Sequence, residues 1–221
     1  MNHANTLQRY HDVIAFWFPD DNINTMDAQQ HRHYWRWRLL GGADEEIVSR
    51  FTKLSAHAAA GHCQQWVTES YGRLALIIVL DQFSRSVWRG TVNAYAQDEE
   101  ALRLCLDGLN NGHYDLLATP WHKIAFTQPL GHCEGPDHLE RMDLLIRLRE
   151  GLLADVPQHL MGIYDTLVQQ ARDVRQVIAT FGRHPHRNHV LGRPSTRAEE
   201  AYIAEQRFPH VRVFSGDDSV S

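Results

Sequence analysis

The sequence predicts an all-α protein, and three observations support this class. Apolar residues recur at spacings of three and four over long stretches, which is the period of a helix with one buried face. Glycine and proline residues separate these stretches. No alternating pattern bounded by hairpin residues competes with them, apart from the short segment VRVF at 211–214.

Composition limits the class of protein. The 221 residues are 43% hydrophobic and 22% charged, so we expect a single helical domain over 1–221, with an irregular tail at 207–221. The net charge of −5 argues against a protein that coats nucleic acid or a membrane surface. Cysteines without a Cys-x-x-Cys pair, and apolar runs far below the roughly 20 residues of a membrane span, favour a cytoplasmic location without membrane contact.

The segment HRHYWRWR at 31–38 interleaves aromatic residues with three arginines. Such a pattern suits stacking on nucleic-acid bases. However, Tyr34, Trp35 and Leu39 also fit one helix face packed on the core, with the arginine side chains extending to solvent. We favour the packing interpretation, and nucleic acid is therefore not an expected partner.

The middle of the chain contains three helical patterns. An apolar stripe at 47–58 ends at Gly61, whose missing Cβ suits a left-handed helix cap. The run LALIIVL at 74–80 is apolar all round, which predicts a helix at the centre of the bundle. Another stripe at 95–109 closes at the Asn-Asn-Gly sequence of 110–112.

The polar segment DQFSRSVWRG, 81–90, directly follows the apolar run, so we expect some of its side chains to be partly buried. If the helix continues, Gln82, Arg85 and Arg89 share one face at spacings of three and four. The alternative is a local ion pair between Asp81 and Arg85, which stand at i and i+4. Periodicity alone favours the local pair.

The clearest apolar stripes lie at 139–152 and 160–181, and the short connection ADVPQ between them predicts antiparallel neighbours. Gly182 is placed to end the second of these helices. Further on, Thr196-Arg-Ala-Glu199 has the spacing of a capping box that starts another helix.

Residues 174–198 contain no acid but five arginines. Planar guanidinium groups with paired donors, close to a helix start, suit a carboxylate or a phosphate. The alternative is that these arginines cap helix ends and pair with acids elsewhere in the fold. The five are Arg175, Arg183, Arg187, Arg193 and Arg197.

The segment LGHCEGPDH, 130–138, is predicted as a loop by its glycines and proline. If it is extended, His132 and Glu134 point to the same side, as an acid-base pair or a metal's ligands would. Zinc needs a third ligand such as His186, and no helix-borne metal motif occurs, so we predict no metal. Cys133 points away from His132 in an extended loop, which argues against a cysteine nucleophile.

Four segments, including FWF at 16–18, resemble the bacterial domain of unknown function 924 family, assigned to the tetratricopeptide-like helical superfamily. Cys133 stands where that family often has serine, which further weakens a cysteine mechanism. The resemblance implies a right-handed array of antiparallel helix pairs, and it implies no known activity. The other three segments are LDQFSRSVWRG at 80–90, HCE at 132–134 and FGRHPHRNHVLGRPST at 181–196.

Three hypotheses of function follow. The favoured one is a polar pocket that binds a small anionic molecule or a peptide carboxylate. The second is an enzyme in which His132 and Glu134 are the acid-base pair and Arg187 stabilises negative charge. The third is a structural or interaction scaffold whose polar clusters only fix helix geometry. No cofactor is implied, and the oligomeric state stays open. The predicted ligand-binding residues are Gln82, Arg85, Arg89, His186, Arg187, Asn188 and Arg193.

Overall fold

The computed structural model describes residues 3–19, 25–205 and 208–209. These residues form helices joined by turns, with no strand among them, so the predicted all-α class is confirmed. The segment VRVF at 211–214, and all of the tail 207–221 except residues 208–209, lie outside the described residues.

The α-helices follow the predicted stripes closely. The stripe at 47–58 lies within α3, and the stripes at 139–152 and 160–181 form most of α8 and α9. In chain order the α-helices are α1 (His3–Trp17), α2 (Ala28–Leu39), α3 (Asp44–Ala59), α4 (Ser70–Ile77), α5 (Ser84–Val87), α6 (Asp98–Asn110), α7 (Pro120–His132), α8 (His138–Leu152), α9 (Met161–Phe181) and α10 (Arg197–Glu205).

The predicted helix ends have the expected local geometry. Gly61, two residues after the end of α3, and Gly182, directly after α9, adopt left-handed φ angles of 79° and 69°. At the start of α10, the backbone N–H of Thr196 donates to Glu199 Oε2 at 2.8 Å, and the N–H of Glu199 donates to Thr196 Oγ1 at 3.2 Å. This reciprocal pair is the predicted capping box.

A buried helical rod runs through the centre of the molecule. Residues 74–80 are each no more than 1% exposed, as their continuous apolar character predicts. The rod begins as α4, continues through a π-helical turn at Ile78–Phe83 and ends as α5. Helices α1, α3, α6 and α7 all contact it. The π-helical turn places one extra residue in the rod at the point where its sequence changes from apolar to polar.

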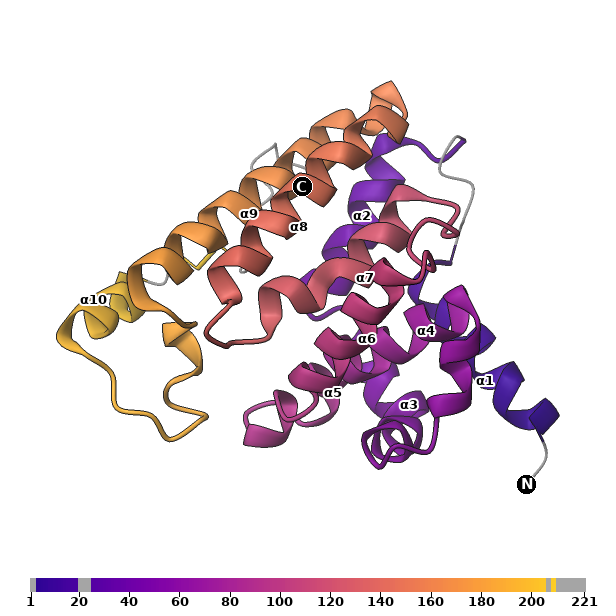
Figure 1. Ribbon diagram of the computed structural model, residues 1–221, viewed down its shortest axis with the longest axis horizontal. Helices are drawn as coiled ribbons and strands as arrows, with labels where there is room; N and C mark the ends of the chain where they lie inside the picture. Colours follow the sequence, from indigo (N-terminus) through magenta and orange to yellow (C-terminus); the bar gives the residue numbers. More distant parts are fainter. Residues whose placement is uncertain (1–2, 20–24, 206–207, 210–221) are drawn as a thin grey trace, which may run out of the picture.

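Helices α8 and α9 form a long antiparallel hairpin along one edge of the molecule, with α2 beside it, while α1 and α3 to α6 gather on the other side (Figure 1). Two short 3₁₀ turns, Leu153–Asp155 and Gln158–Leu160, connect the hairpin. The predicted pairing of these helices is confirmed, whereas the right-handed tetratricopeptide-like array stays a prediction. In the described ranges, no helix has both the length and the apolar character that a bilayer crossing requires.

The predicted loop at 130–138 is partly wrong, because α7 continues to His132. Gly131 is buried and serves close packing rather than a turn: a Cβ added there would lie 3.0 Å from Leu145 Cδ2. The prediction of a turn at Gly131 is therefore wrong, because this glycine lies within a helix. His132 is the last helical residue, and only the residues after it form the turn that leads into α8.

Candidate functional site

A cavity of about 620 Å³ opens between the central rod and the α8–α9 hairpin. Its walls come from the ends of α2 and α7, from α5, α8 and α9, and from the segment that follows α9. Segments distant in sequence therefore meet at one polar site, as the pocket hypothesis requires. Six predicted site residues line it together: Gln82, Arg85, Arg89, His132, His186 and Arg187.

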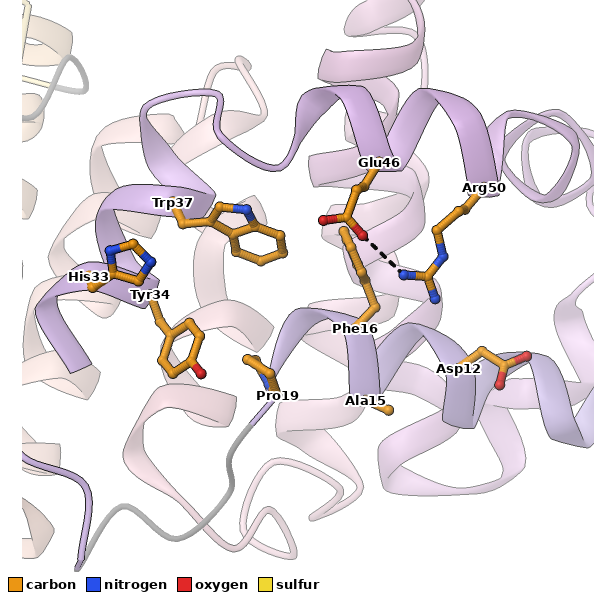
Figure 2. Close-up of a pocket in the computed structure, with 9 residues that line it drawn as sticks. All are labelled: Asp12, Ala15, Phe16, Pro19, His33, Tyr34, Trp37, Glu46 and Arg50. Atoms are coloured by element: carbon orange, nitrogen blue, oxygen red, sulfur yellow. Dashed lines mark hydrogen bonds and ion pairs between the residues drawn. The ribbon is translucent and has the colours of Figure 1, made fainter. Parts of the chain in front are cut away.

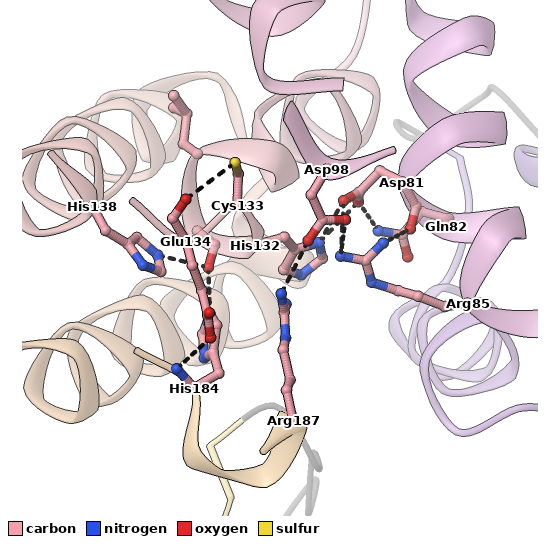
Figure 3. A network of polar contacts seen from close by, with 12 residues as sticks. Asp81, Gln82, Arg85, Asp98, His132, Cys133, Glu134, His138, His184 and Arg187 are labelled. Atoms are coloured by element: carbon pink, nitrogen blue, oxygen red, sulfur yellow. Dashed lines mark hydrogen bonds and ion pairs between the residues drawn. The ribbon is translucent and has the colours of Figure 1, made fainter. Parts of the chain in front are cut away.

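A fully buried carboxylate, Asp81, organises the inner wall. The His132 ring donates from Nδ1 to both Asp81 oxygens at 2.9 Å, and Gln82 Nε2 also donates to this carboxylate. Arg85 Nη2 lies 3.3 Å from Asp81 Oδ1. Figure 3 shows the His132 ring and the Arg85 side chain converging on Asp81. The expected local pair of Asp81 and Arg85 is thus present, but within a larger network.

Asp98, at the start of α6, joins two arginines of this wall. Arg85 Nη2 donates to Asp98 Oδ1 at 2.9 Å, and Arg187 Nη1 donates to Asp98 Oδ2 at 3.0 Å. The Arg187 guanidinium also lies over the ring of Tyr95, with Cζ 4.5 Å from the ring centroid. Arg187 is only 5% exposed, so its contacts fix its position tightly beside the rod.

The electrostatics of this network determine the protonation of His132. Burial raises the pKa of the Asp81 carboxyl, but Arg85 and His132 outweigh burial and hold that pKa below its ordinary value. Asp81 is therefore ionised and only accepts, so the shared proton resides on His132 Nδ1. Burial lowers the pKa of His132; Asp81 opposes this, and Arg85 and Arg187 reinforce it. The imidazole is thus neutral near pH 7, with an unprotonated Nε2.

The predicted pairing of His132 with Glu134 is wrong. Glu134 instead accepts from the backbone N–H of His184 at 2.7 Å and from both terminal nitrogens of Arg193. Because α7 ends at His132 and the chain then turns, the two side chains do not share one side of an extended strand. Asp81 takes the place that we expected for Glu134.

The predicted ligand-binding residues Asn188 and Arg193 belong to this second cluster and are not among the residues that line the cavity. Arg193 Nε donates to Asn188 Oδ1 at 3.1 Å, and Asn188 is 1% exposed. His184 adds a contact from its ring, whose Nε2–H donates to the Gly131 carbonyl oxygen at 3.0 Å. These contacts fasten the segment after α9 onto the end of α7, and a ligand-binding role of Asn188 and Arg193 stays a prediction.

The acid-free segment 174–198 is largely neutralised by acids from elsewhere, as its alternative interpretation proposed. Each of four arginines contacts one carboxylate, which removes most of the excess charge that the sequence suggested. The pairs are Arg175 with Asp143, Arg183 with Glu199, Arg187 with Asp98 and Arg193 with Glu134.

Two cavity-lining arginines that sequence reasoning missed, Arg38 and Arg149, have no carboxylate contact among the described residues. Arg38 is 7% exposed, and its guanidinium carbon lies 4.8 Å from the ring centroids of both Trp35 and Trp121. Its Nη1 donates to the Trp17 carbonyl at 2.6 Å, but its Nε and Nη2 are buried without a hydrogen-bond partner in the described chain. The expectation that arginines of 31–38 extend to solvent is therefore wrong for Arg38.

Arg149 is 3% exposed and projects from α8. It donates to the Leu167 carbonyl at 2.7 Å and to Gln128 Oε1 at 3.1 Å, and its Nε has no partner in the described chain. Burial lowers the pKa of Arg38 to about 9 and that of Arg149 to about 10. Both remain cationic near pH 7, so the wall carries buried positive charge that no described carboxylate balances.

Their positions on apolar stripes were the available signal. Arg38 follows Trp35 by three residues, and Arg149 follows Leu145 by four. Each therefore lies on the buried face of its helix.

The described residues give less support to a cysteine nucleophile or a metal site than to an anion site. Cys133 is 3% exposed, and burial raises the pKa of its thiol to about 11, which is unfavourable for a nucleophile. In the described part of the chain, no group of three or more His, Cys, Asp or Glu side chains is placed to hold a metal ion.

A second cavity of about 390 Å³ lies beside α1, α2 and α3 (Figure 2), where Arg50 already pairs with Glu46 at 3.2 Å.

The fold and cavity define an all-α protein with an arginine-lined polar site. The chain matches the family described as "Bacterial protein of unknown function (DUF924)" over residues 13–207, and it belongs to this family. It is also similar to the solved structure of the protein of unknown function ATU0120 from Agrobacterium tumefaciens, with 25% identity and a TM-score of 0.68. That similarity covers 90% of this chain and 99% of the other. A search of curated proteins gave no match.

Proposed function

We propose that this protein binds a small molecule with an anionic group, a carboxylate or a phosphate, in the cavity between the central rod and the α8–α9 hairpin. The observation that carries this proposal is the pair of buried, cavity-lining arginines, Arg38 and Arg149, which have donor nitrogens without partners in the described chain. A buried charge without a partner is costly, and a bound anion would supply both the opposite charge and the hydrogen-bond acceptors.

The charge of the whole wall points the same way. Five arginines line the cavity, whereas the carboxylates that contact them are Asp44, Asp81 and Asp98. The remaining two positive charges are those of the unpaired arginines described above. Burial lowers the pKa of His132 and of His184, which also lines the cavity, so these two side chains add little charge at neutral pH.

The shape and the apolar part of the wall support a small molecule over a peptide. A volume of about 620 Å³ lies within the range of small-molecule sites. Leu39, Met142, Leu145 and Val174 line the same cavity, so the ligand we propose has an apolar body beside its anionic group. This arrangement also favours binding over a purely structural scaffold, because the polar wall opens onto a cavity instead of being sealed between helices.

The test compares a carboxylate with its neutral isostere by isothermal titration calorimetry. Hexanoate should bind at least about tenfold more tightly than hexanamide, since one charge-assisted contact contributes about 1.5–3 kcal/mol. Inorganic phosphate, titrated separately, distinguishes a phosphate site from a carboxylate site.

Arg149→Met should abolish the preference for hexanoate. The matched control is Arg147→Met, which removes the same charge from the exposed side of α8 and should preserve the preference. Equal binding of hexanoate and hexanamide to the wild type, with no binding of phosphate, would refute the proposal. So would full hexanoate affinity in Arg149→Met.

A further inference from the structure

The dyad of Asp81 and His132 borders the cavity of the proposed anion site and has the geometry of a general base. Asp81 is 0% exposed and is not part of the cavity wall, whereas the His132 side chain is 25% exposed and lines it. The ring edge that faces the cavity is therefore the edge away from Asp81. Because Nδ1 carries the proton toward Asp81, the lone pair of Nε2 belongs to this accessible edge.

A fixed positive charge, that of Arg187, stands beside this base. Arg187 is buried and lines the cavity, and its Nε has no hydrogen-bond partner in the described chain, while its Nη1 is held by Asp98. The positive charge of Arg187 lies close enough to influence the protonation of His132. A base and a fixed positive charge at one wall are the two groups that addition of water to a carbonyl carbon requires.

Among the described residues that line this wall, no strong side-chain nucleophile competes with water. The Ser86 hydroxyl donates to Asp44 Oδ1 at 2.6 Å, and Cys133 is buried and is not among the lining residues. Water is therefore the nucleophile that His132 is placed to activate. The single positive charge of Arg187 beside His132 suits the one oxyanion formed from a carboxylic ester, whereas a transferred phosphoryl group spreads its charge over three oxygens.

We propose that His132, positioned by Asp81, is the general base of a hydrolytic site that cleaves a carboxylic ester of a small anionic molecule. This inference rests on the proposed anion site, which would hold the substrate through Arg38 and Arg149. His132 is the catalytic residue, since it contacts the reacting water, and Asp81 is a positioning residue.

The proposed reaction is balanced without a further reactant. His132 Nε2 takes one proton from water as the water oxygen bonds to the ester carbonyl carbon, and the carbonyl oxygen becomes an oxyanion that the positive charge of Arg187 stabilises. The tetrahedral intermediate then collapses, the bond from carbon to the alcohol oxygen breaks, and that oxygen takes the proton back from Nε2. The products are a carboxylic acid and an alcohol, and His132 is again neutral.

The test uses mono-4-nitrophenyl succinate, an ester with a free carboxylate, and follows release of 4-nitrophenol. The wild type should hydrolyse it, and His132→Gln should lower kcat by about 10²–10⁴-fold, the usual contribution of general acid-base catalysis. The matched control, His62→Gln, changes an exposed histidine after α3 and should leave the rate unchanged. The neutral ester 4-nitrophenyl butyrate should be a poorer substrate.

Asp81→Asn tests the positioning role through the pH profile. In the wild type, kcat should rise with pH as His132 loses its proton. Asp81 raises the pKa of His132, so in Asp81→Asn the increase of kcat with pH should occur at lower pH. The maximal kcat should also fall. Loss of folded protein alone would lower kcat without shifting its pH dependence. A profile with an unshifted midpoint would contradict the role of Asp81.

Carbethoxylation by diethyl pyrocarbonate provides a readout on the unmodified protein, because this reagent reacts with unprotonated imidazole nitrogens. Peptide mapping should show rapid modification of His132, slowed by hexanoate, and slow modification of His138, which is 1% exposed. A His132 no more reactive than His138 would overturn the inference.

The outcomes separate the two proposals. The hydrolytic site is overturned, and the anion site preserved, if hexanoate binds normally but the ester is hydrolysed no faster than in buffer. The same conclusion follows if hexanoate binds normally and His132→Gln hydrolyses the ester as fast as the wild type. If the wild type binds hexanoate no more tightly than hexanamide and does not bind phosphate, both the anion site and the hydrolytic site are overturned.

Discussion

Replacing Arg149 with methionine should abolish the proposed anion binding with little loss of stability. Burial lowers the pKa of Arg149 to about 10. Because the folded pKa is depressed, the charged form is the destabilised one at pH 7, by roughly 3 kcal/mol at about 1.4 kcal/mol per tenfold change. Methionine of similar length removes this cost and adds an apolar contact.

The opposing loss is similar in size. Arg149 donates to Gln128 Oε1 and to the Leu167 carbonyl. Leu167 lies inside α9, where the helix already supplies its carbonyl with a donor, so mainly Gln128 loses a partner, at about 1–3 kcal/mol. We therefore expect the free energy of unfolding to remain within about 1 kcal/mol of the wild type, or to rise.

Arg141 on the same helix provides the contrasting control. Arg141 is 5% exposed and lies outside the cavity wall. It pairs with Asp137 at 3.0 Å, and it donates to the carbonyls of Leu130 and Cys133 at the end of α7. Arg141→Met should cost about 1–3 kcal/mol for each carbonyl left unpaired. Each kcal/mol lowers Tm by about 2–4 °C in a chain of this size. Urea denaturation measures both variants, and an Arg149→Met loss equal to that of Arg141→Met would refute the reasoning.

Three further predictions concern the fold. Burial lowers the pKa of His31 to about 3 and that of His138 to about 4, so the unfolded chain takes up protons first as pH falls. Urea denaturation should show the free energy of unfolding falling by about 2 kcal/mol per histidine between pH 7 and pH 5, and a flat profile would contradict this. Gly72→Ala should lower Tm sharply, because its Cβ would lie 2.2 Å from a backbone carbonyl oxygen, whereas Gly162→Ala, with nothing within 4 Å, should be neutral or stabilising; equal Tm values would oppose this. Asp98→Asn should destabilise the chain by about 3–5 kcal/mol in urea, since two arginines lose their shared carboxylate, and wild-type stability would argue against that role.

The helices were predictable because their signals are local. Long apolar stripes fixed α8 and α9, and the capping pair of Thr196 and Glu199 marked the start of α10. The same local evidence misled at Gly131, because a glycine that permits close packing has the same sequence as one that turns the chain. Only the position of Leu145 across the α7–α8 contact distinguishes the two.

The partners within the candidate site were less predictable for a different reason. His132 meets Asp81 across 51 positions of sequence, and Arg187 meets Asp98 across 89, so no periodicity links them. Local evidence selected Glu134, the nearest carboxylate in the sequence, in place of Asp81. By contrast, the burial of Arg149 was predictable, because this residue lies on the apolar face of its helix. A check of every charged residue for its position on an apolar helix face would have identified it.

The π-helical turn at Ile78–Phe83 has a consequence for sequence variation in this fold. Each helical residue advances the chain by about 100°, so deleting one residue from this turn would rotate α5 by about that angle relative to α4. The apolar run before it would stay enclosed, but Arg85 and Ser86 would swing away from the hollow that they now border. Chains with a shortened rod would thus retain the scaffold while losing one side of the cavity, which makes rod length a simple marker for sorting relatives.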